Sequence, residues 1–198
     1  MEEEALQMFE EPEVIPYIPA FLREERKGSA TERGTAYHRV LECMDLSGIR
    51  HSDQVKERME NLVLQGKLTG QAAETINPYD IYVFSKSSLC NRLLNAEQNG
   101  RLSKEQPFVI AKPAGEISKD YESDKDVLIQ GIIDAYFEES DGIVLIDYKT
   151  DRVKTAEELI ARYKKQLELY GEALEQTTGK RVKERIMYSF CLGKEISV

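Results

Sequence analysis

The sequence predicts a mixed α/β (α+β) fold in a single domain, on three observations. Helical periodicity dominates the first hundred residues, two apolar β-branched runs between Gly131 and Thr150 flank an acidic turn, and an amphipathic helix and a last strand follow. A chain of 198 residues is long enough to bury a sizeable core. The expected order is α-β-β-β-α-β, with an extra helical insertion after the first helix.

The first helix is expected over residues 29–44, SATERGTAYHRVLECM. Ser29 and Glu32 have the spacing of a capping box, and apolar side chains then recur at helical intervals. Gly34 inside this helix costs about 1 kcal/mol, which indicates a close approach of another part of the chain. Residues 53–97 are expected to form two or three further helices, broken at two glycines and at an Asn-Pro pair.

A strand at residues 104–111 is followed by a hairpin whose turn is Asp141-Gly142. A four-residue loop there would pair Glu138 with Ile143, and an antiparallel ladder would then place Asp134 opposite Asp147 on one face. Alternation puts Lys149 on that face as well. A slip of one residue would separate the two aspartates.

The C-terminal part is expected to form one long helix and one strand. Thr155 and Glu158 form a second capping-box pattern, and the helix should end before Gly179. The stretch VKERIMYSFCL then reads as the last strand.

Composition excludes several classes of protein. The chain has no apolar run of membrane-spanning length, no signal peptide and no Walker-type loop, so we expect a cytoplasmic protein that binds no nucleotide itself. The three cysteines are scattered, which argues against a disulfide framework or an iron–sulfur cluster. The net charge of −9 disfavours tight binding to free DNA, although residues 149–185 carry a net charge of +3.

The two acids of the hairpin are the main functional signal. Like charges opposed on a half-buried sheet are destabilising unless a positive charge lies between them. Mg²⁺ is the natural candidate because it prefers oxygen ligands, and a lysine two residues on would steady the water that attacks phosphorus. The alternative is that the aspartates sit solvated or lysine-paired at strand ends. The pattern of Asp134, Asp147 and Lys149 favours metal-assisted hydrolysis of a phosphodiester.

Four short motifs give this pattern a family resemblance. G-I-I-D…I-D-Y-K-T resembles the core signature of the PD-(D/E)XK nucleases, most closely the RecB/AddA-type nuclease domain of bacterial helicase–nucleases. R-G-T-A-Y-H resembles its histidine motif, E-Q-P-F the start of its first core strand, and Q-L-E-L-Y its Q-x-x-x-Y motif. The resemblance covers roughly residues 29–190 and implies a restriction-endonuclease-like core. Residues 1–28, which are acidic and proline-bearing, are expected to form an arm or linker, and residues 29–198 the nuclease domain.

The resemblance also implies the site residues. Asp134 and Asp147 would be carboxylate ligands, the backbone carbonyl of Tyr148 would add an oxygen, and His38 would contribute an imidazole or position water at the metal. Lys149 would steady the nucleophilic water, and Gln166 and Tyr170 would hold Lys149 or the DNA backbone. By its spacing, Glu42 lies one helical turn after His38 on the same face and would orient the ring. Glu105 is either a further acid at the metal or an exposed strand-edge residue.

The implied activity is a Mg²⁺-dependent DNase, with Mn²⁺ as a possible substitute and no iron–sulfur cluster. The domain would cut strands delivered by a helicase during double-strand-break processing and recombinational repair. Its expected partners are DNA, the helicase portion of the same polypeptide or complex, and a second helicase–nuclease subunit, without a membrane. Two alternatives remain open: a stand-alone exonuclease or structure-specific endonuclease of the same fold, and a catalytically dead scaffold that contacts DNA or a partner.

Overall fold

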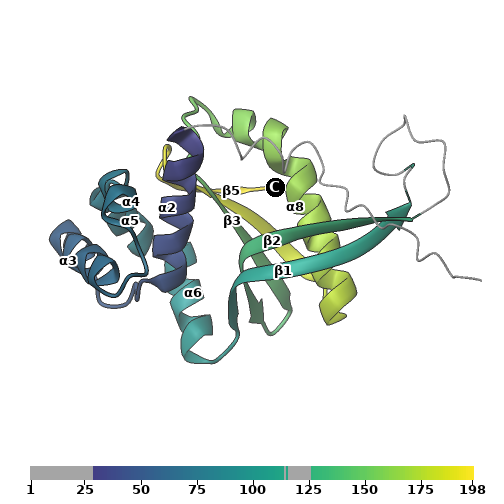
Figure 1. Cartoon of the computed structure of the whole chain (residues 1–198). Coiled ribbons are helices and arrows are strands. Elements are labelled where there is room, and N and C mark those ends of the chain that lie inside the picture. The colour runs from purple at the N-terminus through teal and green to yellow at the C-terminus, as the bar shows by residue number, and fades with distance from the viewer. Residues whose placement is uncertain (1–28, 114, 116–125) are drawn as a thin grey trace, which may run out of the picture.

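A computed structural model describes residues 29–113, 115 and 126–198 of the chain. Its centre is a five-stranded sheet of order β1-β2-β3-β4-β5, with helices α2 to α6 gathered on one side and α8 on the other (Figure 1). The acidic arm predicted at 1–28 lies outside the described residues. The elements are α2 (Ser29–Cys43), α3 (Ser52–Leu64), α4 (Gly70–Glu74), α5 (Pro78–Ser85), α6 (Ser88–Gln98), β1 (Leu102–Pro113), β2 (Asp126–Glu139), β3 (Gly142–Lys149), α8 (Ala156–Thr178), β4 (Val182–Ser189) and β5 (Lys194–Ser197).

The predicted order of elements is confirmed, with one strand more than expected. Strand β4 pairs with β3 in parallel, and α8 connects the two, as a parallel crossover requires. The additional strand, β5, pairs antiparallel with β4 at the edge of the sheet. It spans four residues, too few for a period-two pattern to be recognised in the sequence.

The hairpin has the predicted register but a tighter turn. Glu138 pairs with Ile143 as expected, whereas the four-residue loop is wrong because Glu139 and Gly142 also pair. Ser140 and Asp141 alone form the loop. Gly142 has a φ of 147°, in the region that favours glycine.

The helical insertion contains four helices, α3 to α6, where two or three were expected. The Asn-Pro break is a helix start: Asn77 accepts a hydrogen bond from the amide of Tyr79, and Pro78 occupies the first turn of α5. Ser87 caps α6 in the same way through the amide of Cys90. These short helices pack with α2 over one face of the sheet.

The long helix α8 begins and ends where predicted, but its capping box is absent. Thr155 is the N-cap residue and its side chain makes no capping hydrogen bond. Glu158 accepts instead from the amide of Lys154, at 3.3 Å. At the other end Gly179 adopts the left-handed conformation, with φ 68°. The side chain of Ser29, in the other predicted box, lies outside the described residues.

Along the two-stranded ribbon of β1 and β2, the helices against which one face packs change at one position. Phe137 packs in the cluster formed with α2 to α6, whereas Ile133, on the same face of the strand by alternation, packs in the cluster formed with α8. Between them, Asp134 and its neighbour Glu105 are left out of a ladder that continues on both sides. Glu105 has a φ of 47°, which is unusual for a residue other than glycine. This position is where the candidate site lies.

None of the helices in the described ranges is both long and apolar enough to cross a membrane.

Candidate active site

Three side chains from three elements meet at the turning point of the ribbon. His38 of α2, Glu105 of β1 and Asp134 of β2 each offer one ligand atom, and these atoms lie within 4.8 Å of one another. Glu105 and Asp134 face each other across β1 and β2, and α2 places His38 over them. An imidazole and two carboxylates at this separation form a donor set suited to a divalent cation.

The backbone of Tyr148 completes the cluster. His38 Nε2 lies 3.0 Å from the Tyr148 carbonyl oxygen, and His38 Nδ1 lies 3.3 Å from Asp134 Oδ1. The amide of Tyr148 donates to Asp134 Oδ2 at 2.7 Å. Backbone pairing between β2 and β3 ends at the pair Ala135–Ile146. At the next position the side chain of Asp134, rather than its backbone, connects the two strands.

The cluster shifts the pKa values of its members. Burial lowers the pKa of His38, but the charges of Asp134 and Asp147 outweigh it and raise the pKa to about 9. Burial and the charge of Asp134 raise the pKa of Glu105 to about 6. Burial opposes ionisation of Asp134, yet the charges of His38 and Lys149 hold its pKa below the ordinary value. The charges of Asp134 and Asp147 thus favour the protonated form of His38.

A second polar group adjoins the cluster under α8. Asp147 is 1% exposed and Lys149 4%, and Lys149 Nζ lies 3.2 Å from Asp147 Oδ2. Lys149 donates to Gln166 Oε1 at 3.3 Å, and Gln166 donates to the Tyr170 hydroxyl at 2.7 Å. All four predicted residues of this group are buried and connected. Burying these groups is costly unless their polar atoms are paired, and the ion pair of Asp147 with Lys149 and the hydrogen bonds of Gln166 offset part of that cost.

Two residues have a place in the site that the sequence left open or did not assign. Glu105, expected either as a further acid at the metal or as an exposed strand-edge residue, belongs to the cluster with His38. Tyr163 fitted the apolar stripe of its helix, yet its ring centroid lies 4.0 Å from Lys149 Nζ. The E-Q-P-F motif was the available signal for Glu105. For Tyr163 the signal was its place one helical turn before Gln166.

The role expected for Glu42 is wrong. Glu42 accepts from Arg39 at 2.6 Å and so pairs with its own helix rather than orienting His38. The approach expected at Gly34 is to Thr150, directly after Lys149, and a β-carbon there would lie 3.5 Å from Thr150 Oγ1. That is ordinary contact, so space alone does not demand glycine.

Several basic side chains of the positively charged segment 149–185 have acidic partners. Lys183 lies 2.5 Å from both Glu139 and Asp141, and Arg162 lies 3.5 Å from Asp151. Their charges are therefore partly compensated within the domain.

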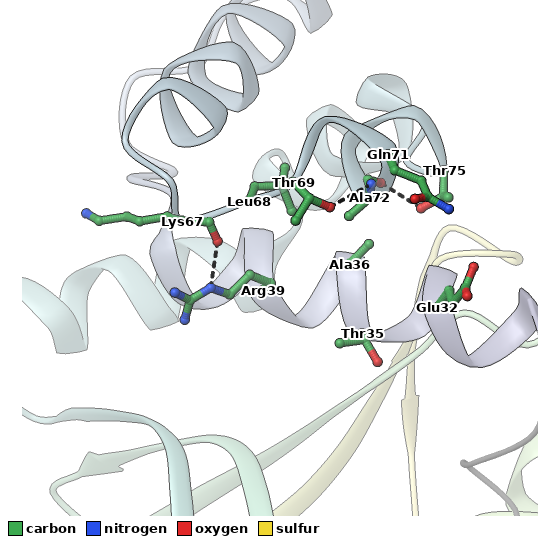
Figure 2. Close-up of a pocket in the computed structure, with 10 residues that line it drawn as sticks. All are labelled: Glu32, Thr35, Ala36, Arg39, Lys67, Leu68, Thr69, Gln71, Ala72 and Thr75. Atoms are coloured by element: carbon green, nitrogen blue, oxygen red, sulfur yellow. Dashed lines mark hydrogen bonds between the residues drawn. The ribbon is translucent and has the colours of Figure 1, made fainter.

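A cavity of about 430 Å³ lies on the other side of α2 from the sheet, against α4 and the segment before it (Figure 2). Arg39 Nε donates to the carbonyl of Lys67 at one end, at 2.8 Å, and Ala36 points from α2 toward α4. The ten described residues that line the cavity include none of the cluster His38, Glu105 and Asp134. The cavity and this cluster have only helix α2 in common. The lining residues are Glu32, Thr35, Ala36, Arg39, Lys67, Leu68, Thr69, Gln71, Ala72 and Thr75.

Comparisons with known proteins identify the family to which the chain belongs. The chain is 41% identical over 93% of its length to an ATP-dependent helicase/nuclease subunit of Lachnoclostridium phytofermentans, and 40% identical over 91% to the subunit of the same name from Clostridium botulinum strain Loch Maree. It spans 16% and 14% of those relatives' lengths. The crystal structure of SSO0001 aligns over 86% of this chain and 76% of its own, with a TM-score of 0.37 and 17% identity, too low to support an inference.

The resemblance to the nuclease domain of helicase–nucleases is thus confirmed, and the five-stranded mixed sheet between helices is consistent with a restriction-endonuclease-like core. Residues 17–195 match the pattern of the PD-(D/E)XK nuclease superfamily, and the chain belongs to that family.

Proposed function

We propose that this chain is a divalent-metal-dependent DNase domain that hydrolyses DNA phosphodiesters. The observation that carries the proposal is the meeting of His38, Glu105 and Asp134 within 4.8 Å, beside a buried lysine 3.2 Å from Asp147. Carboxylate and carbonyl oxygens dominate this donor set, which suits Mg²⁺, with Mn²⁺ as its substitute.

Each residue has a chemical task in this proposal. The cation would be held by His38, Glu105, Asp134, Asp147 and the carbonyl of Tyr148. It would supply the positive charge that activates water and offsets the charge of the phosphate. The ligands come from a helix and three strands, so the fold sets their separation.

Lys149 would act directly on the substrate. Its ammonium group is buried, and burial strengthens its attraction for a phosphate oxygen because water does not screen the charge. Gln166 accepts a hydrogen bond from Lys149 and would fix the direction of the ammonium group. Tyr170 would fix Gln166 in turn.

The relatives support a narrower proposal about context. Because both are named as a subunit of an ATP-dependent helicase/nuclease, we propose that the domain cuts DNA strands delivered by a helicase during double-strand-break processing and repair, in a complex with a second helicase–nuclease subunit. The charge of −9 supports delivery, since an acidic domain should bind free DNA weakly and with strong salt dependence.

Digestion of linear DNA with Mg²⁺ tests the proposal. The wild type should cleave, while Asp147→Asn and Lys149→Gln should each lower the rate by about 100-fold or more. Asp53→Asn and Lys56→Gln on α3 are matched controls and should cleave like the wild type. Equal cleavage by all five proteins would refute the assignment of the site.

The scaffold alternative has its own outcome in the same experiment. A scaffold would bind DNA without cleaving it at any Mg²⁺ or Mn²⁺ concentration, and its melting temperature would not rise with either ion.

A further inference from the structure

Tyr163 lies directly against the ammonium group of Lys149. The nitrogen is 4.0 Å from the centre of the ring, within the range in which the negative face of an aromatic ring attracts a cation. Lys149 is 4% exposed, so little water competes for this contact. Tyr163 stands one helical turn before Gln166 on α8, and the two side chains reach the lysine from the same helix.

The ring differs in kind from the other partners of Lys149. Asp147, at 3.2 Å, offers a full negative charge that compensates the ammonium, and Gln166 Oε1 accepts a hydrogen bond from it. The ring attracts the cation without a net charge and without a carboxylate's acceptor atoms. It therefore holds the nitrogen in place without neutralising its charge.

The hydroxyl group of Tyr163 fixes the ring from its other end. It donates to Asp151 Oδ1 at 2.9 Å, and Asp151 follows Lys149 by two residues in the segment after β3. The side chain thus ties α8 to the end of β3 at two points, one on either side of Thr150.

We propose that Tyr163 is a positioning residue for Lys149, and that its ring, rather than its hydroxyl group, is what the cleavage step requires. This inference rests on the proposed function and deepens it. It assigns to α8 a third residue, beside Gln166 and Tyr170, that acts on DNA cleavage through the lysine.

Two substitutions separate the ring from the hydroxyl group. Tyr163→Phe keeps the ring and should cleave DNA at close to the wild-type kcat. Tyr163→Leu removes the ring and should lower kcat by about 10- to 30-fold with little change in KM, the loss expected for a cation–π contact shielded from water. Tyr82→Leu is the matched control, because its ring also faces a lysine, Lys86 at 5.5 Å, on a different helix. It should leave kcat unchanged.

A proton NMR measurement gives a readout that needs no catalysis. The ε-methylene protons of Lys149, assigned by their loss in Lys149→Arg, should be shifted upfield by the ring in the wild type and in Tyr163→Phe, and should return to ordinary values in Tyr163→Leu. Unshifted protons in the wild type, or a folded Tyr163→Leu variant that cleaves like the wild type, would overturn the proposal. If Tyr163→Leu does not fold, the wild-type and Tyr163→Phe shifts decide. A wild type that shows the shift but never cleaves DNA would instead refute the proposed function.

Discussion

Asp134 holds the backbone of Tyr148 with its side chain: Oδ2 accepts from the Tyr148 amide at 2.7 Å, at the point where backbone pairing between β2 and β3 stops. His38 contacts the carbonyl of the same residue. One carboxylate therefore has two tasks, one in the fold and one in the proposed chemistry, and substitutions can separate them.

Asp134→Asn and Asp134→Ala should both abolish cleavage but differ in stability. Asparagine still offers an oxygen to the Tyr148 amide, whereas alanine leaves this buried donor unsatisfied, which costs about 1–3 kcal/mol. Urea unfolding monitored by circular dichroism measures the difference in the free energy of unfolding. Equal stability of the two variants would show that the hydrogen bond has no role in the fold.

The cluster should bind Mn²⁺ with measurable stabilisation. An ion that binds only the folded state at about 100 times its Kd adds about 2.7 kcal/mol to the free energy of unfolding. Glu105→Gln should weaken this thermal shift because it removes one of the clustered carboxylates. Glu60→Gln on α3 is the control and should show the full shift. A full shift in Glu105→Gln would remove Glu105 from the ligand set.

Gly131→Ala should destabilise the protein by about 1–3 kcal/mol through overpacking. A β-carbon at Gly131 would lie 2.8 Å from the Phe108 ring, and that ring packs edge-on against Tyr170 at 5.3 Å between centroids. Gly70→Ala, where a β-carbon meets open space, is the control. Thermal melts measure both variants, and a neutral Gly131→Ala would mean that Phe108 can move without cost.

The ion pairs of Arg92 should govern stability in acid. Arg92 binds Glu139 and Glu184 at 2.9 and 2.7 Å, and its hydrogen bond lowers the pKa of Glu139 to about 2. A carboxyl whose pKa is depressed in the folded state stabilises that state at pH values above its pKa in the unfolded chain, about 4.5. This contribution is lost as the pH falls toward 2.

Glu139→Gln should therefore lower the melting temperature at pH 6 and flatten its fall between pH 4.5 and 2. Melting temperatures recorded across this range measure the effect, with Glu60→Gln as the control. Parallel curves for wild type and Glu139→Gln would contradict the stabilising role of the pair.

Those parts of the fold that depend on local chemistry could be predicted from the sequence. The Asp141-Gly142 turn set the register in which Glu138 pairs with Ile143 and Ala135 with Ile146, directly next to the two aspartates of the motif. Gly179 marked the end of α8 because glycine tolerates the left-handed conformation found there. The loop length was wrong because the tighter two-residue turn gives the same register.

Features that depend on how distant segments meet could not be predicted in this way. The position of Glu105 follows from a ribbon that turns over, with a φ of 47° that periodicity does not reveal. Tyr163 has the spacing of a core residue, and only the packing of α8 against β3 turns its ring toward Lys149. Glu42 shares a helix face with His38, but Arg39 is a nearer partner with opposite charge.

Crystals of the wild type grown with Mn²⁺ test the central claim most directly. Anomalous scattering should give a peak among His38, Glu105 and Asp134, at roughly 2.0–2.4 Å from their ligand atoms. The absence of a peak there at a saturating Mn²⁺ concentration, with the His38 ring still in contact with Asp134 and the Tyr148 carbonyl, would contradict the account.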